Sequence, residues 1–178
     1  YLPISDLSSN LYAIYLMVPD KRDKIAEVAK LIFENVLSKI GYEPKEEDNV
    51  RIARLRDTLI WRGFQFGSEQ AKEYADKLFL EWREGKQIPA DILSSVVKVG
   101  AAIHPEHGEY ILKRLESHEA TETEKVHLLG AIASFRDEKL IEIVTNVVFD
   151  KVPLRNRGIV LQTLSTNPIF MPKAWQWF

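Results

Sequence analysis

The sequence contains no cysteine. Disulfide bonds, thiolate metal sites and cysteine nucleophiles are therefore excluded from this chain. A lack of cysteine fits a protein that works in the reducing interior of the cell, and we expect a cytoplasmic location.

The chain also lacks a long apolar run and an excess of one charge. The apolar run Tyr12–Val18 is far shorter than the roughly 20 residues needed to cross a bilayer. The first residues have neither an initiator methionine nor the basic region of a signal peptide. The net charge of −2 gives no global attraction to nucleic acid or to an anionic membrane. We therefore expect no nucleic-acid partner and no membrane partner.

The sequence does contain strong helical periodicity. With 46% apolar and 28% charged residues, its 178 residues have the composition of a folded protein. Apolar residues recur every three to four positions along 25–40, 50–60 and 71–82, the spacing of one helix face. No stretch alternates with a period of two, so we expect no sheet. Gly41, Gly67 and Gly85 stand where helix ends are expected, because helix ends favour glycine. Ser68 stands where a helix start is expected and can act as its N-cap.

From Pro89 onward, helix-start signals recur at a regular spacing. They are first-turn prolines, a capping box and N-cap residues, at Pro89, Pro105, Thr121 with Glu124, Asp137, Pro153 and Asn167-Pro168. Positions 105, 121, 137, 153 and 169 differ by 16, so two short helices make a unit of 32 residues. The pattern predicts an all-α fold over 1–178, a single domain built as a right-handed superhelical stack of antiparallel helix pairs. Such a stack is a HEAT-like solenoid.

The pair His118-Glu119 is similar to the start of the zinc motif H-E-x-x-H, in which two imidazoles lie one helical turn apart. Glu122 occupies the place of the second histidine. The next imidazole, His127, is nine residues after His118, and Thr121 is expected to start a new helix between them. We interpret His118-Glu119 as a loop.

A second cluster that could bind metal is His104-Pro105-Glu106-His107. Because we find no third ligand for the two imidazoles in the nearby sequence, we interpret it as a turn with surface histidines, with adventitious metal binding as the alternative. Phosphate-binding glycine loops and the G-x-S-x-G elbow are absent. We predict no catalytic residue, no metal ligand and no cofactor in this chain.

Two groups of arginines are candidate binding residues. The first lies on one expected helix with Trp61 and Phe64 and consists of Arg51, Arg54, Arg56 and Arg62. Arginines among aromatic rings can bind nucleic acid, but the segment also holds Glu46, Glu47, Asp48 and Asp57. We interpret it as a solvated, ion-paired helix face.

The second group is Arg155 and Arg157, which flank Asn156 at an expected helix start. Their guanidinium groups could hold a carboxylate, such as a peptide C-terminus. The alternative is that they cover apolar surface and bond loop carbonyls or acidic neighbours. Arg155 and Arg157 are the substrate-contact candidates of this sequence.

Several segments, taken in order, carry a family resemblance. They are Ile40-Gly41-Tyr42 with Leu55-Arg56, Ile88-Pro89-Ala90-Asp91, Lys125–Phe135 with Asp137, and Asn167-Pro168 with Ala174–Phe178. They resemble the L-G-W…L-R, I-P-x-D-[IL], K-x-x-x-L-x-A-L-x-x-x-x-D and N-P-x-x-x-x-x-A-W-x-[WF]-[LIV] segments of the C-terminal helical domain of gluzincin zinc aminopeptidases. That family includes the puromycin-sensitive aminopeptidase, the endoplasmic-reticulum aminopeptidases and the tricorn-interacting factors. The resemblance covers about residues 40–178. Where relatives often have R-x-Q-D, this chain has Arg155 to Gly158, so only Arg155 keeps the pattern.

The resemblance implies that the chain is an incomplete C-terminal domain of a larger aminopeptidase. Such an enzyme binds zinc in an earlier catalytic domain and removes N-terminal residues from peptides. The chain itself would be inactive, closing over the catalytic domain of the same polypeptide and shaping the chamber that binds the peptide substrate. The alternative function is a free-standing helical-repeat scaffold that binds a protein partner through its concave face.

Overall fold

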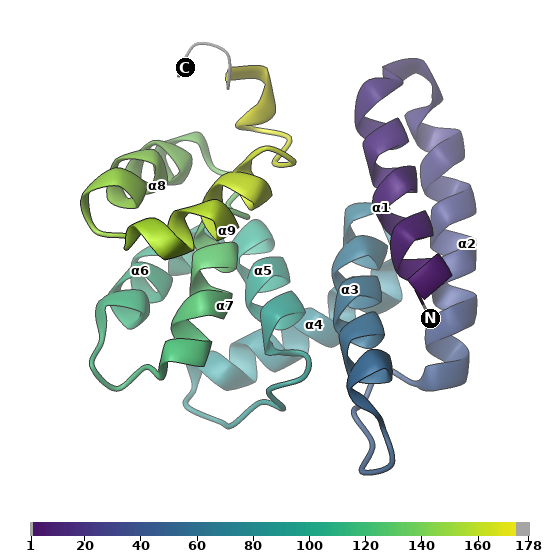
Figure 1. Ribbon diagram of the computed structural model, residues 1–178, viewed down its shortest axis with the longest axis horizontal. Helices are drawn as coiled ribbons and strands as arrows, with labels where there is room; N and C mark the ends of the chain where they lie inside the picture. Colours follow the sequence, from purple (N-terminus) through teal and green to yellow (C-terminus); the bar gives the residue numbers. More distant parts are fainter. Residues whose placement is uncertain (1, 174–178) are drawn as a thin grey trace. The chain divides into compact units, whose positions relative to one another are not determined.

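The computed structural model of the protein describes residues 2–173 (Figure 1). Within that range the chain is helical and forms no strand, so the prediction of an all-α fold is confirmed. The segment Ala174–Phe178 of the family resemblance lies outside the described residues. The α-helices are α1 (Leu2–Met17), α2 (Arg22–Ile40), α3 (Val50–Gln65), α4 (Glu69–Arg83), α5 (Leu93–Ile103), α6 (Gly108–Glu116), α7 (Glu122–Ile132), α8 (Glu138–Asp150) and α9 (Leu154–Leu164). The short 3-10 helices are η1 (Pro19–Lys21), η2 (Pro105–His107) and η3 (Met171–Lys173).

Contacts within the chain form two compact units, 1–96 and 97–178, and the boundary between them falls inside α5. In the first unit, α1 packs on α2 and α3, α2 packs on α3, and α3 packs on α4. In the second unit, α7 packs on α6, α8 and α9, and α8 packs on α9. Packing between sequence neighbours, with further contacts to the next helix but one, is the local arrangement of a helical solenoid. A single domain over 1–178 stays a prediction.

Most of the predicted helix ends are confirmed. Gly41 follows α2 with φ of 81°, a left-handed conformation that side chains with a Cβ rarely adopt. Gly67 and Gly85, after α3 and α4, share it. Ser68, Thr121 and Asp137 accept hydrogen bonds from backbone N–H groups in the first turns of α4, α7 and α8.

The spacing of helix starts in the second unit follows the predicted period. Helices α7, α8 and α9 begin at Glu122, Glu138 and Leu154, which are 16 residues apart. Pro105 begins η2, which runs directly into α6. The regular period therefore reflects one helix and its turn, repeated.

Details of the helix starts expected at Thr121, Pro89 and Pro153 need correction, and the start expected at Asn167 is described below. The Glu124 carboxylate, expected to complete a capping box, instead accepts hydrogen bonds from Arg114 Nε at 2.8 Å and Nη2 at 3.1 Å. Pro89 lies in a turn that precedes α5 and is not part of its first helical turn. Pro153 is the residue before α9 and not its first helical residue.

The apolar run Tyr12–Val18 contributes Tyr12 to the buried core of the first unit, while Ile14, Met17 and Val18 are exposed. It lies at the end of α1, where the rings of Tyr12 and Tyr15 contact the buried Phe66 at centroid distances of 5.7 and 5.3 Å. Edge-to-face aromatic contacts of this kind add to the free energy gained by burying the rings. Among the described residues, no helix combines the length and apolar character that a membrane crossing needs.

Arg56 corrects the interpretation of the arginine-rich helix as a solvated face. Its side chain is fully buried and forms an ion pair with Asp48 at 2.6 Å. Its Nε donates to the Gly41 carbonyl at 2.9 Å, and its Nη2 donates to the Ile40 carbonyl at 3.1 Å. The carbonyls at the end of α2 have no partner within their own helix, so Arg56 supplies one from α3.

Asp48 is held in its ionised form by the same loop. The Lys45 backbone N–H, which donates to Asp48 at 2.8 Å, is the largest cause of a lowered pKa for this carboxyl, and Arg56 adds to the effect. The carboxylate therefore remains a partner for Arg56 over the whole neutral pH range.

The other residues of that helix have different roles. Arg51 and Arg54 are exposed, whereas the Arg62 guanidinium lies 4.3 Å from the Tyr12 ring centroid and burial lowers its pKa. Asp57, which we had counted as a balancing surface charge, accepts a hydrogen bond from the Ser95 N–H at 2.7 Å. Asp57 thus caps the first turn of α5 from a different helix.

Asn167 performs a similar task in the second unit. It is buried, and its Nδ2 donates to the carbonyls of Ala133 and Phe135, both at 2.8 Å. Its Oδ1 accepts from the N–H groups of Ile169 and Phe170, as an N-cap side chain does, but residues 168–170 form a turn, so the helix start predicted at Asn167-Pro168 is wrong. One amide group therefore joins the loop after α7 to the turn that follows α9.

We expect Arg56→Met to lower the free energy of unfolding by about 3 kcal/mol, because it leaves a carboxylate and two carbonyls without their buried donor. Urea denaturation followed by circular dichroism measures the change. The control is Arg54→Met on the same helix, expected to change stability by less than about 0.5 kcal/mol. Equal effects of the two variants would contradict the role assigned to Arg56.

We expect Asn167→Ala to lower the free energy of unfolding by about 2 kcal/mol, since two carbonyls and two N–H groups lose their partner. Asn146→Ala, at an exposed position of α8, is the matched control and should be close to neutral. Thermal denaturation of both variants provides the comparison. An unchanged Tm for Asn167→Ala would contradict the role of Asn167 in joining the two segments.

Candidate functional site

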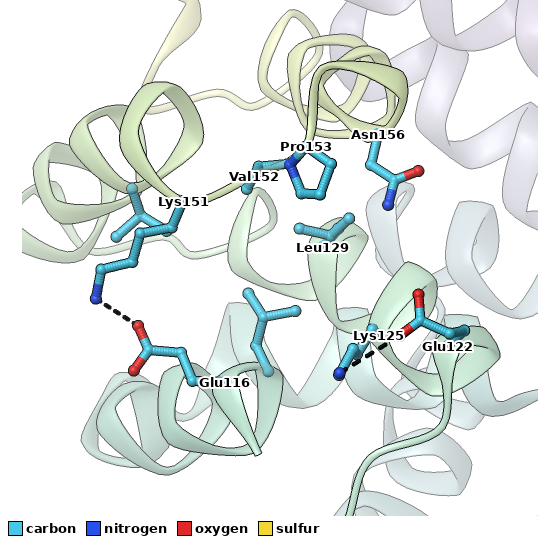
Figure 2. A pocket seen from close by; sticks show the side chains of 10 residues that line it. Glu116, Glu122, Lys125, Leu129, Lys151, Val152, Pro153 and Asn156 are labelled. Carbon is cyan, nitrogen blue, oxygen red and sulfur yellow. Dashed lines mark hydrogen bonds and ion pairs between the residues drawn. The ribbon is translucent and has the colours of Figure 1, made fainter. Parts of the chain in front are cut away.

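A cavity of about 250 Å³ lies in the second unit, where α6, α7, α8 and α9 meet (Figure 2). Its lining residues come from the end of α6, from α7, from the second half of α8, from the connection between α8 and α9, and from the start of α9. They are Leu115, Glu116, Glu122, Lys125, Leu129, Val147, Lys151, Val152, Pro153 and Asn156. A mixed apolar and charged cavity of this size, just below the usual range of ligand pockets, has room for one or two side chains of a peptide or for a small molecule.

The spacing of residues on α7 explains how one helix supplies three of these side chains. Glu122, Lys125 and Leu129 lie three and four positions apart, so they project from the same face of the helix. Leu129 and Val152 are buried and form apolar wall, which Figure 2 shows beside Pro153. The start of α7 is fixed by the Thr121 cap, and Arg114 ties it to α6 through Glu124.

Charged groups line the cavity in pairs. Lys151 Nζ lies 2.5 Å from Glu116 Oε1, and Lys125 Nζ lies 3.4 Å from Glu122 Oε1 (Figure 2). The exposed side-chain fractions of Lys151 and Glu116 are 61% and 55%, so their pairing is worth about 0–1 kcal/mol at most. A charged ligand can replace such a partner at little cost. The ten lining residues contain no serine, threonine, cysteine or histidine.

The structure separates the two arginines that the sequence put forward. The Arg155 side chain is 77% exposed, and its Nη2 lies 3.8 Å from Glu122 Oε2 at the cavity. Arg157 turns toward the preceding loop, where its Nε donates to the Val152 carbonyl at 3.0 Å. Asn156, between them, lines the cavity. Of the two candidates, Arg155 has the charged group that is available to a ligand.

The histidine motifs also lie in different surroundings. His118-Glu119 forms an exposed turn between α6 and α7, as predicted, and Glu119 Oε2 lies 3.3 Å from Arg114 Nη1. At η2, by contrast, donor atoms of His104, Glu106 and His107 all lie within 4.8 Å of one another. Sequence reasoning missed Glu106 as the third donor, although it stands between the two histidines.

The cavity itself could not be located from the sequence. Its walls come from four helices whose ends meet only in the folded unit. The one available signal was the charge of Glu122 and Lys125 on the face of α7 that also carries Leu129.

The whole chain, residues 1–178, matches the model of the family described as "ERAP1-like C-terminal domain". The chain is also similar to the alanine/arginine aminopeptidase of Saccharomyces cerevisiae, with 25% identity over 146 residues. That alignment covers 80% of this chain and 17% of the yeast protein, so the chain spans about a sixth of the length of that relative. These findings confirm the resemblance to the C-terminal domain of aminopeptidases. The chain belongs to the ERAP1-like C-terminal domain family.

Proposed function

We propose that this chain is the non-catalytic C-terminal helical domain of a zinc aminopeptidase that removes N-terminal residues from peptides. The observation that carries the proposal is the match of all 178 residues to the ERAP1-like C-terminal domain. The similarity to an aminopeptidase of Saccharomyces cerevisiae supports the class of reaction. In this proposal the partners are the catalytic domain of the same polypeptide and the peptide substrate. A cytoplasmic location stays a prediction that depends on the lack of cysteine.

The residues of this chain do not fit the catalytic zinc of such an enzyme. His118 lies in a turn and His127 lies in α7, so no two imidazoles share a helix face at the spacing that the motif H-E-x-x-H requires. We therefore assign the reactive zinc of the parent enzyme to its catalytic domain and derive no chemical step from this chain.

The contribution of the chain is to bind and position the peptide. We infer that the cavity between α6 and α9 takes part of the substrate and that Arg155 pairs with the carboxylate at the far end of the peptide. Arg155 is exposed beside the cavity, and within residues 2–173 the ion-pair distance from its guanidinium group to Glu122 is a long 3.8 Å. A guanidinium group matches a carboxylate with two parallel hydrogen bonds, which a single distant glutamate does not supply. A helical domain that closes over the catalytic domain also excludes water from the chamber.

We expect Arg155→Ala, made in the full-length parent enzyme, to raise the KM for a long peptide about tenfold, because one charge-assisted contact is worth about 1.5 kcal/mol. The value of kcat for a short aminoacyl reporter should stay unchanged. Steady-state kinetics with a free-acid peptide and with its C-terminal amide test the assignment, since the amide should lose the sensitivity to Arg155.

Two variants sharpen this measurement. Glu122→Gln removes the competing carboxylate and should lower the KM for the free-acid peptide. The control is Arg54→Ala, because Arg54 is exposed in the first unit. This variant should leave the KM for both substrates unchanged. A loss of activity that is equal for the peptide and the reporter would show that Arg155 does not bind the substrate.

We further expect the isolated 178-residue chain to release no amino acid from aminoacyl reporter substrates, with or without added Zn²⁺, because its histidines do not form the H-E-x-x-H pattern that places a glutamate general base beside the catalytic zinc. A fluorogenic assay provides the measurement. Turnover that a chelator abolishes, and that disappears in His118→Gln, would overturn the non-catalytic assignment.

A further inference from the structure

Three donor groups that bind transition metals meet at η2, the short turn between α5 and α6. His104 Nδ1 lies 2.9 Å from Glu106 Oε1, and the rings of His104 and His107 have centroids 5.4 Å apart. One donor atom from each of the three residues lies within 4.8 Å of the other two. Among the described residues, these three are the one group of three or more histidine, aspartate or glutamate side chains whose donor atoms lie this close together. It lies outside the cavity described above.

The backbone fixes these three residues in place. The His104 N–H donates to the Gly100 carbonyl at 2.9 Å and so continues the last turn of α5. The His107 N–H donates to the His104 carbonyl at 3.0 Å, which closes the 3-10 turn begun by Pro105. Residues three apart in such a turn lie on the same side of it, and this places the two imidazoles next to each other.

The next residue anchors the turn to the rest of the second unit. Gly108 begins α6 under the side chain of Leu140 from α8, and a Cβ at this position would lie 2.6 Å from Leu140 Cδ1. The close packing of α6 against Leu140 leaves η2 little freedom to shift. The ligands therefore stand on a short segment held at both ends, which lowers the cost of ordering them around an ion.

We propose that His104, Glu106 and His107 form a binding site for a divalent transition-metal ion, with Zn²⁺ as the best match. Two imidazoles and one carboxylate are a donor set that Zn²⁺ prefers, and a fourth position stays open to water. Bonds of about 2.0 Å at tetrahedral angles hold two ligand atoms roughly 3.3 Å apart. The His104–Glu106 pair needs to open by only a few tenths of an ångström from 2.9 Å, and the His107 donor atom, within 4.8 Å of the other two, needs to approach them by about 1.5 Å at most.

This site differs from the catalytic zinc of the proposed parent enzyme and does not depend on that proposal. Its ligands are partly exposed and come from the single turn that connects the end of α5 to the start of α6. A bound ion therefore stabilises this connection. The site revises the expectation of no metal ligand, which rested on the two imidazoles having no third partner. Because the ion binds the folded turn, Zn²⁺ should also raise the Tm of the chain.

The experiment is isothermal titration of the metal-free 178-residue chain with ZnSO₄. We expect one ion per chain, and we expect His104→Gln, Glu106→Gln and His107→Gln each to weaken binding by about tenfold or more. The matched control is His118→Gln, which removes an exposed histidine from another turn and should leave the affinity within about twofold. Far-UV circular dichroism confirms that each variant is folded.

A second measurement on the unmodified chain keeps the test independent of the variants. In spectra of ¹⁵N-histidine-labelled protein, Zn²⁺ should shift the ring signals of His104 and His107 and leave those of His118 and His127 in place. The proposal is overturned if binding is weaker than about 1 mM, an affinity too low for a specific site. It is also overturned if His118→Gln weakens binding as much as the other variants, or if all four histidines shift together.

Discussion

Helix ends buried in a helical stack leave backbone N–H and carbonyl groups that need partners, and this requirement governs the structure. Each helix ends with carbonyls that its own turns cannot satisfy, and burial away from water makes an unpaired group costly. In this chain some partners are local caps such as Ser68, Thr121 and Asp137, and others come from distant parts of the sequence. Arg56 of α3 serves the end of α2, Asp57 of α3 serves the start of α5, and Asn167 serves the loop that follows α7. Apolar packing fills the space between the helices, while these polar contacts fix where each helix stops.

The same contacts explain what the family resemblance consists of. The segment Ile40-Gly41-Tyr42 and the pair Leu55-Arg56 are joined by the hydrogen bonds from Arg56 to Ile40 and Gly41. The segment Lys125–Phe135 is joined to Asn167 in the same way, through the carbonyls of Ala133 and Phe135. Motifs that lie far apart in the sequence are therefore joined directly by hydrogen bonds in the folded chain. They identify a fold, and a fold alone does not identify a chemical reaction.

The two features assigned a binding role lie at helix ends for a related reason. Helix ends carry the turns, and turns expose polar side chains over a framework that packing keeps rigid. The cavity collects the ends of α6 and α8 and the starts of α7 and α9, with the charged pairs Lys151–Glu116 and Lys125–Glu122 at its walls. The turn η2 collects His104, Glu106 and His107 between α5 and α6.

The sequence alone determined the all-α class, most of the helix ends and the 16-residue period, because these depend on local effects. Positive φ at glycine, side-chain caps such as Asp137 and the spacing of apolar residues act within one or two helical turns. Only the tertiary structure decided that Arg56 is buried, that Glu124 pairs with Arg114, and that Arg155 and Arg157 point to different partners. Periodicity places an arginine on a helix face but does not reveal which neighbour covers that face. The same limit applied to the cavity and to Glu106, because a binding site is a meeting of side chains in space.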